Sequence, residues 1–222
     1  MAYSYSALKE YQQCPRKYYE NKILKKWPFL KTDAIMYGEE VHKALEEYVG
    51  KGVDLGKHSR FKGLADSITR IKGEKLVEFK MSLDYSLQPC DYFHQNVYLR
   101  GVADVIVLDK GKNRAYIVDY KTGGAKYPDK DQLELMALMV FRYFPDITHV
   151  KAALLFVVHD VTITAEYHKK DAKPKWASWV AKINEIETAR ENNVWHEKNG
   201  PLCGWCNCEE CPHWSDKRRG KC

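Results

Sequence analysis

Three charged residues, Asp104, Asp119 and Lys121, lie in one largely apolar segment, GVADVIVLDKGKNRAYIVDYKTG, which spans residues 101–123. Charged side chains in apolar surroundings are costly unless they are paired or bound to a metal ion. Carboxylate oxygens suit a hard cation such as Mg²⁺, which acidifies a bound water and neutralises charge that grows on a phosphate. A nearby lysine can orient or deprotonate that water, or hold the phosphate. The alternative is a buried salt-bridge cluster, because Asp-x-Lys is a short and common pattern.

Two strands are expected to bring these side chains together. Gly101–Leu108 and Ala115–Lys121 are rich in β-type residues, and the polar stretch between them contains a glycine, as in a hairpin. Alternate side chains of a strand share a face, so Asp119 and Lys121 point the same way. Asp104 can face the same side from the partner strand.

The other elements follow from periodicity and from turn residues. We predict helices over Ser4–Ile23, with a break at Cys14-Pro15, and over Asp33–Val49, Asp129–Phe144 and Pro174–Asn193, and strands over Leu76–Leu83, Tyr92–Leu99, Val150–Val158 and Val161–Glu166. His42 borders the apolar stripe of the second helix, where a satisfied core histidine is the alternative to a ligand. Glu78 in the first strand either faces solvent or adds a third carboxylate. Gln132 either caps its helix or contacts a phosphate or base.

Composition limits the classes of protein to be considered. The chain has 222 residues, of which 45% are hydrophobic, enough for one moderately large domain with a full core. Lys and Arg number 36 and the net charge is +6, which suits a phosphate-bearing partner. No apolar run has the length of a membrane span, and the N-terminus lacks the apolar core of a signal peptide. We therefore expect a cytoplasmic protein that does not bind membranes.

Cysteines cluster near the C-terminus. Five of the seven fall in the last twenty residues: Cys203, Cys206, Cys208, Cys211 and Cys222. A disulfide framework is not expected in a reducing compartment, so this density indicates a metal site. Cys14, followed by a proline near the other end of the chain, is either a small buried residue or a further ligand.

These motifs, in this order, resemble the PD-(D/E)XK nuclease superfamily, and within it the RecB-like and Cas4-like exonucleases, including those of phages. The resemblance covers nearly the whole chain and rests on five segments: SYSALKEYQQCPRKYYE, GEEVH, GVADVIV, IVDYKTG and QLELM. It implies an α/β fold with a restriction-endonuclease-like core, in which helices flank a central mixed sheet that carries the site on one edge. One departure is Met136, which stands where the family has a tyrosine four residues after the glutamine.

The resemblance also implies roles for single residues. His42, Asp104, Asp119 and the backbone carbonyl of Tyr120 would hold Mg²⁺ or Mn²⁺. Lys121 would assist the attacking water, with Gln132 and Glu78 as further members of the catalytic site. Phosphate contacts by Lys and Arg would make DNA binding weaken as salt rises.

A [4Fe–4S] cluster is the corresponding expectation for the cysteines. Cys14, Cys203, Cys206 and Cys211 would be its ligands and would join the two chain ends beside the core. The rival is a zinc site formed by Cys203, Cys206, His213 and either Cys208 or Cys211.

The expected function is therefore metal-dependent DNA cleavage in a bacterial or phage-infected cell, acting on single-stranded or end-bearing DNA during recombination, repair or DNA processing. Helicase, recombination or integration proteins are candidate partners. Residues 1–30 would contribute a helical segment with one cluster cysteine, 31–195 the nuclease core and 196–222 the cysteine-rich end. The rival is a non-catalytic nucleic-acid-binding module with a structural zinc site.

Overall fold

The computed structural model describes residues 2–214, and it divides into two compact units. The first, here called the core unit, consists mainly of Lys31–Trp176, and the second, the terminal unit, combines Tyr3–Leu30 with the chain from Ala177 onward. Cys222 lies outside the described residues. The predicted division at residues 30 and 195 stays a prediction.

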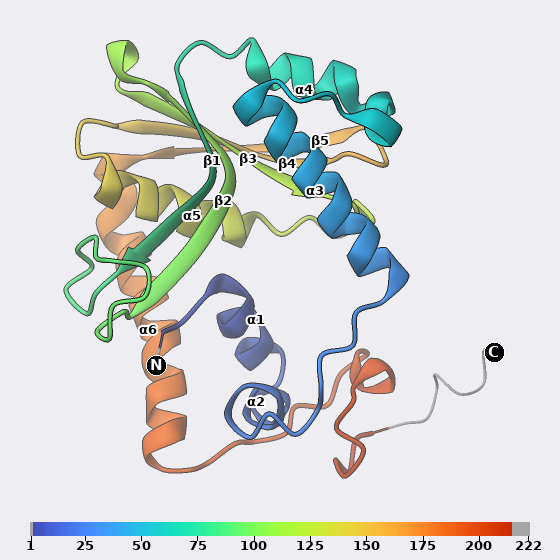
Figure 1. Cartoon of the computed structure of the whole chain (residues 1–222). Coiled ribbons are helices and arrows are strands. Elements are labelled where there is room, and N and C mark those ends of the chain that lie inside the picture. Colours follow the sequence, from blue (N-terminus) through green and yellow to red (C-terminus); the bar gives the residue numbers. More distant parts are fainter. Residues whose placement is uncertain (1, 215–222) are drawn as a thin grey trace. The chain divides into compact units, whose positions relative to one another are not determined.

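A five-stranded mixed sheet forms the centre of the core unit (Figure 1). Its strands are β1 (Glu74–Leu83), β2 (Leu99–Asp109), β3 (Arg114–Lys121), β4 (His149–Phe156) and β5 (Val161–His168). They are arranged in chain order, and every neighbouring pair is antiparallel except β3 and β4. A parallel pair needs a crossover, which here contains α5 (Lys130–Tyr143). The expected α/β architecture with a mixed sheet is confirmed.

Helices cover both faces of this sheet (Figure 1). One face packs against α3 (Asp33–Lys51), η2 (Gly56–Phe61) and α4 (Lys62–Thr69) through a buried cluster that includes Val41, Leu45, Phe61, Val105 and Val118. The helix α5 lies on the other face, and eight consecutive or nearly consecutive residues from Leu133 to Phe141 are buried. A helix that is apolar nearly all round belongs in an interior, and α5 is one.

The hairpin expected around the acidic residues forms as β2 and β3, connected through η3 (Lys110–Lys112) and Asn113. Asn113 has φ 49°, in the left-handed region that asparagine tolerates. Both strands lie in the interior of the sheet. The expectation that the site occupies an edge of the sheet is therefore wrong, because β2 is also paired with β1 and β3 is also paired with β4.

The predicted strand Tyr92–Leu99 is also wrong. Residues 84–98 form a long loop between β1 and β2, and the strand begins only at Leu99. Aromatic residues favour strands, but two backbone bonds here close local turns: His94 N donates to the Asp91 carbonyl and Val97 N donates to the His94 carbonyl. Contact with β1 begins at Tyr98, whose N–H donates to the Leu83 carbonyl at 2.8 Å. Local turns thus override the β propensity of the aromatic residues.

The terminal unit consists of helices and connecting loops. It contains α1 (Tyr5–Gln13), α2 (Pro15–Tyr18), η1 (Tyr19–Ile23), most of α6 (Ala172–Glu191) and η5 (Cys203–Trp205), and a last short helix, η4 (Lys169–Asp171), belongs to the core unit. The break at Cys14 occurs as expected, with extended φ and ψ of −164° and 110° before Pro15. Among the described residues, no helix is long and apolar enough to cross a membrane.

Candidate functional site

The site begins where β2 separates from β3. The paired register of these strands ends at Val105 and Val118, whereas β3 continues beside β4 as far as Lys121. The N–H of Tyr120 therefore has no backbone partner on β2. The carboxylate of Asp104 takes the place of that missing ladder bond, because its Oδ2 accepts from Tyr120 N at 2.6 Å. The separation of the two strands thus positions Asp104 against the end of β3.

Asp119, Lys121 and Gln132 form a closed network beside it. Lys121 Nζ lies 2.6 Å from Asp119 Oδ2 and donates to Gln132 Oε1 at 2.9 Å. The amide nitrogen of Gln132 donates to Asp119 Oδ1 at 2.7 Å. Asp119 and Lys121 share a face of β3, and Gln132 reaches them from the first turn of α5.

His42 and Glu78 complete the acidic side of the site. His42 Nδ1 lies 3.5 Å from Asp104 Oδ2, and its ring packs edge-on against Tyr120 with centroids 5.7 Å apart. Glu78 stands opposite Asp104 in the β1–β2 register, between the paired positions Val77 and Phe79. Its φ of 47° is left-handed, which is a strained conformation for a glutamate. The structure therefore gathers every side chain that the sequence singled out in the core unit.

Burial and mutual charge perturb these groups. Asp119 is only 3% exposed, and burial, with the charge of Asp104 adding to it, raises the pKa of Asp119 to about 6 against the opposing pull of Lys121. Burial and the same Asp104 charge also raise the pKa of Glu78. Burial alone would lower the pKa of His42, but the hydrogen bond and charge of Asp104 outweigh it and raise the pKa. Carboxylates whose pKa is raised by burial and by a neighbouring charge, beside a groove, make this cluster a candidate functional site.

A groove of about 580 Å³ opens beside His42 and Glu78. Among the other residues that line it are three polar ones that the sequence did not suggest, Lys43, Glu46 and Thr122. Lys43 and Glu46 follow His42 on α3, and Thr122 directly follows Lys121. Their closeness in sequence to these motif residues is the one feature of the sequence that could have pointed to them. Gly38 lets α3 lie close to Thr122, since a Cβ at position 38 would meet Thr122 Oγ1 at 2.9 Å.

The donor set suits a divalent cation. One imidazole and two carboxylates converge with the Tyr120 backbone, and Mg²⁺ and Mn²⁺ prefer such hard ligands. Asp119 Oδ2 is buried, and apart from its close approach to Lys121 no described group completes a well-directed hydrogen bond to it. Among residues 2–214, no three metal-ligating side chains lie close enough together to hold an ion. A cation would therefore have to draw the ligands inward and displace Lys121 from Asp119.

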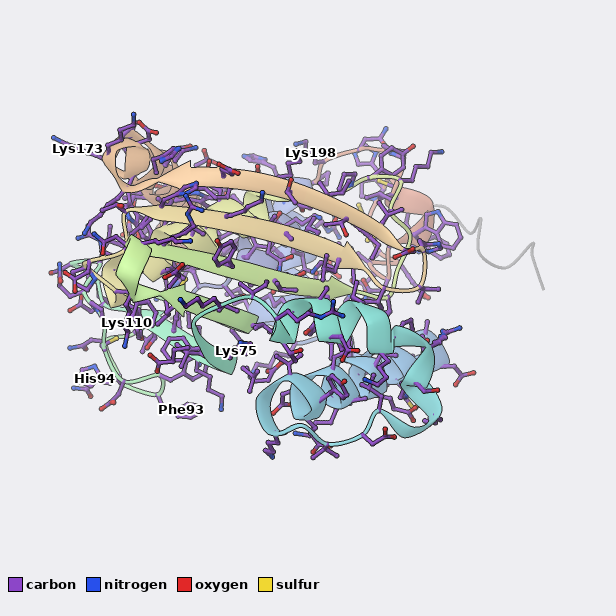
Figure 2. All side chains as sticks on the ribbon, turned by 90° about the horizontal axis from the view of Figure 1, so that it is seen from above. Lys75, Phe93, His94, Lys110, Lys173 and Lys198 are labelled. Carbon is purple, nitrogen blue, oxygen red and sulfur yellow. The ribbon has the colours of Figure 1, made fainter. Side chains whose placement is uncertain are left out.

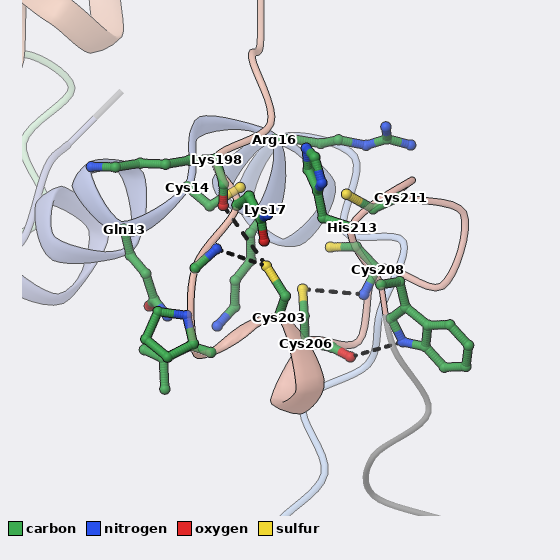
Figure 3. A pocket seen from close by; sticks show the side chains of 15 residues that line it. Gln13, Cys14, Arg16, Lys17, Lys198, Cys203, Cys206, Cys208, Cys211 and His213 are labelled. Carbon is green, nitrogen blue, oxygen red and sulfur yellow. Dashed lines mark hydrogen bonds between the residues drawn. The ribbon is translucent and has the colours of Figure 1, made fainter.

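The terminal unit holds a second candidate site, a thiol-lined cavity of about 210 Å³. Five cysteines line it, with His213 and three basic side chains (Figure 3): Cys14, Cys203, Cys206, Cys208, Cys211, Arg16, Lys17 and Lys198. None of these cysteines forms a disulfide. The chain ends meet here through Arg16, which donates to the Glu210 carbonyl at 3.2 Å, and Lys198, which donates to the Gln12 carbonyl at 3.1 Å.

Backbone N–H groups already point at two of the sulfurs. Gly200 N donates to Cys203 Sγ at 3.3 Å, and Cys208 N donates to Cys206 Sγ at 3.5 Å (Figure 3). A hydrogen bond from the Cys208 thiol also lowers the pKa of Cys206 to about 6. Thiolates are the form that binds soft metals, so these contacts favour ligation.

Comparison with solved structures gives the fold independent support. A protein described as "Putative exonuclease", from Eubacterium rectale, superposes with a TM-score of 0.50 at 15% identity, over 95% of this chain and 86% of that one. The structure of SSO0001 superposes with a TM-score of 0.41 at 13% identity, over 96% of this chain and 87% of that one. The first likeness shows a shared fold, and the second is too weak for an argument. A search of the curated proteins finds no match.

A sequence model of a protein family is more decisive. The model of the PD-(D/E)XK nuclease superfamily matches residues 2–68 and 56–214, nearly the whole chain. The match includes both strands of the acidic hairpin and the helices that carry His42 and Gln132. By this match over nearly its whole length, the chain belongs to the PD-(D/E)XK nuclease superfamily.

Proposed function

We propose that the protein is a metal-dependent deoxyribonuclease, acting as an exonuclease on single-stranded DNA or on DNA with free ends. The observation that carries this proposal is the convergence of His42, Asp104, Asp119, Lys121 and Gln132 beside an open groove. A merely structural ion pair would not need a strained glutamate and a second carboxylate at the same point. The exonuclease fold neighbour is consistent with it.

In this proposal His42, Asp104, Asp119 and the carbonyl of Tyr120 hold Mg²⁺ or Mn²⁺. The bound cation supplies an acidified water and stabilises charge on the phosphate. Lys121 holds the attacking water or the phosphate, and Gln132 fixes the position of the lysine ammonium through the 2.9 Å bond. Glu78 orients the lysine or a second cation from its strained position on β1.

For the terminal unit we propose a [4Fe–4S] cluster on Cys14, Cys203, Cys206 and Cys211, which would make the protein Cas4-like within its superfamily. Support comes from Cys14, which lines the same cavity as the C-terminal cysteines although it lies nearly two hundred residues away in sequence. A zinc site would need only the C-terminal residues. Iron and zinc analysis of the purified protein, with its colour, decides between them, since the cluster is brown and zinc is colourless.

The proposed nuclease activity also suggests a cellular role. We propose action in bacterial or phage recombination, repair or DNA processing, in the cytoplasm, with helicase, recombination or integration proteins as partners. Basic residues would supply phosphate contacts, so DNA affinity should fall as salt rises.

The decisive experiment is cleavage of end-labelled single-stranded DNA with Mn²⁺ or Mg²⁺ and with EDTA. We expect shortening of the strand only when the metal is present, and no shortening with Asp119→Ala. Asp146→Ala is the matched control, because Asp146 is an exposed carboxylate of the same unit. Binding without any metal-dependent cleavage would instead favour the non-catalytic binding module.

A further inference from the structure

Outside the groove, the loop between β1 and β2 displays aromatic rings to solvent. Phe93 is 82% exposed and Tyr85 is 62% exposed. Figure 2 shows Phe93 and its neighbour His94 projecting outward from the end of the sheet. Burying such rings would stabilise the fold, so leaving two of them in water within one short segment indicates a ligand that covers them.

The loop is long but well held. Asp84 Oδ1 accepts from Ser86 N at 2.8 Å and from Gln88 N at 2.9 Å. Ser82 Oγ donates to the Cys90 carbonyl at 2.6 Å, and Tyr143 OH of α5 donates to the Ser82 carbonyl at 3.0 Å. Connections of this length without secondary structure are uncommon and are usually functional. A rigid loop presents its rings at little entropic cost to binding.

Two cations lie over aromatic rings of this loop, those of Tyr92 and Phe93. Lys80 Nζ lies 5.6 Å from the ring centroid of Tyr92 and 5.8 Å from that of Phe93, and the Arg100 guanidinium lies 5.7 Å from the Tyr92 centroid. Within residues 2–214 neither cation forms an ion pair with a carboxylate, so both charges remain available to phosphates. We call Lys80, Tyr85, Tyr92, Phe93 and Arg100 the aromatic platform.

The platform and the candidate site share the strands β1 and β2. Arg100 lies four positions before Asp104 on β2. Lys80 is paired across the β1–β2 ladder with Val102, which lies between them. At a rise of about 3.3 Å per residue, Arg100 and Asp104 are roughly 13 Å apart along the strand. A few unpaired nucleotides cover such a distance.

We propose that the aromatic platform binds unpaired nucleotides of a DNA strand, with bases stacked on Tyr85 and Phe93 and phosphates on Lys80 and Arg100, and feeds that strand toward Asp104. Stacked bases have hidden faces, so a duplex cannot use the rings in this way, whereas every unpaired base offers a flat surface. The choice of ligand rests on the proposed nuclease function, while the binding step does not require cleavage.

The test is fluorescence anisotropy of a labelled oligo-dT strand of roughly 20 nucleotides in EDTA, with Phe93→Leu compared with Phe93→Trp. Leucine keeps the apolar character but removes the flat ring, so we expect Kd to rise about tenfold, and tryptophan should bind at least as tightly as the wild type. Binding of a blunt duplex should be unchanged by either substitution. Phe29→Leu is the matched control, since Phe29 is 76% exposed and belongs to the terminal unit.

Equal oligo-dT affinity for Phe93→Leu and the wild type would overturn the proposal, as would an equal loss for Phe29→Leu. The result separates from that of the cleavage assay. If the protein cuts no DNA but Phe93→Leu weakens oligo-dT binding, the platform proposal stands and the nuclease proposal is refuted. If the protein cuts DNA and Phe93→Leu leaves oligo-dT binding unchanged, the nuclease proposal stands and the platform proposal is refuted.

Discussion

The two candidate metal sites are built in opposite ways. The carboxylate site of the core unit stands on regular elements: β2, β3, α3 and α5 each contribute at least one side chain, and backbone pairing sets their register. The thiol-lined cavity of the terminal unit stands on short turns, with η5 of three residues as the only helix between Cys203 and Trp214. The first site is positioned by regular secondary structure, whereas four of the five cysteines of the second lie in a loop.

This difference indicates whether a metal ion would serve catalysis or folding at each site. The carboxylate site is held together without a cation, because Lys121 and Gln132 neutralise and bond Asp119. The loop that lines the cavity contains no regular element longer than three residues, and Cys208 is the only buried cysteine among the described ones. A metal should therefore matter for chemistry in the core unit and for folding in the terminal unit.

The largest effect is expected for the double variant Cys203→Ser and Cys206→Ser, because a metal bound by thiolates contributes folding free energy directly. If the wild type binds the proposed [4Fe–4S] cluster, the double variant should lose all bound iron and colour and be rapidly proteolysed within the segment 197–214, read by mass spectrometry of limited digests. Cys90→Ser is the matched control, since Cys90 is a free thiol of the core unit. Retained iron in the double variant would refute the ligand assignment.

Next in size is Lys121→Met. If the ammonium acts on the attacking water, cleavage should slow by about 10²–10⁴-fold. Mn²⁺ affinity, measured by calorimetry, should stay the same or rise, because a positive charge next to Asp119 is removed. Lys170→Met, at an exposed lysine of the same unit, should leave the rate unchanged. A rate loss shared by both variants would argue against a specific role.

Asp119→Asn should stabilise the metal-free protein. Burial raises the pKa of Asp119 from 3.8 to about 6, so the native state binds more protons than the unfolded state between these values. Wild-type stability is consequently lost as pH rises through that window. We expect the variant to gain about 1–3 kcal/mol at pH 8 and nothing below the unfolded pKa, from denaturant titrations at each pH. A gain independent of pH, or one matched by Asp146→Asn, would contradict this cause.

The smallest effect is the pH dependence of Mn²⁺ binding. His42 must lose its proton to bind a cation, and its pKa is raised by Asp104, while Asp119 holds its proton up to about pH 6. Affinity should therefore fall as pH is lowered through this range, by up to about tenfold per pH unit for each proton displaced. Calorimetry of His42→Gln should show a shallower slope, and an unchanged slope would exclude His42 as a ligand.

Much of the site could be predicted from local pattern. The alternation in IVDYK places Asp119 and Lys121 on one face, and the apolar run that follows Gln132 marks α5 as a buried helix. The break at Cys14 follows from Pro15 alone. These features depend on sterics between near neighbours, which the sequence states directly.

Tertiary structure decided the rest. The Tyr92–Leu99 segment has strand-forming residues, yet local turns make it a loop that exposes Phe93. No local pattern shows that β2 pairs with β3 only from Val105 onward, so the bond from Tyr120 N to Asp104 was not predictable. The sequence by itself determined which groups are available and which face of a strand or helix they occupy. Their meeting required long-range pairing, since the partner of an unpaired backbone N–H is chosen by whatever the fold brings beside it.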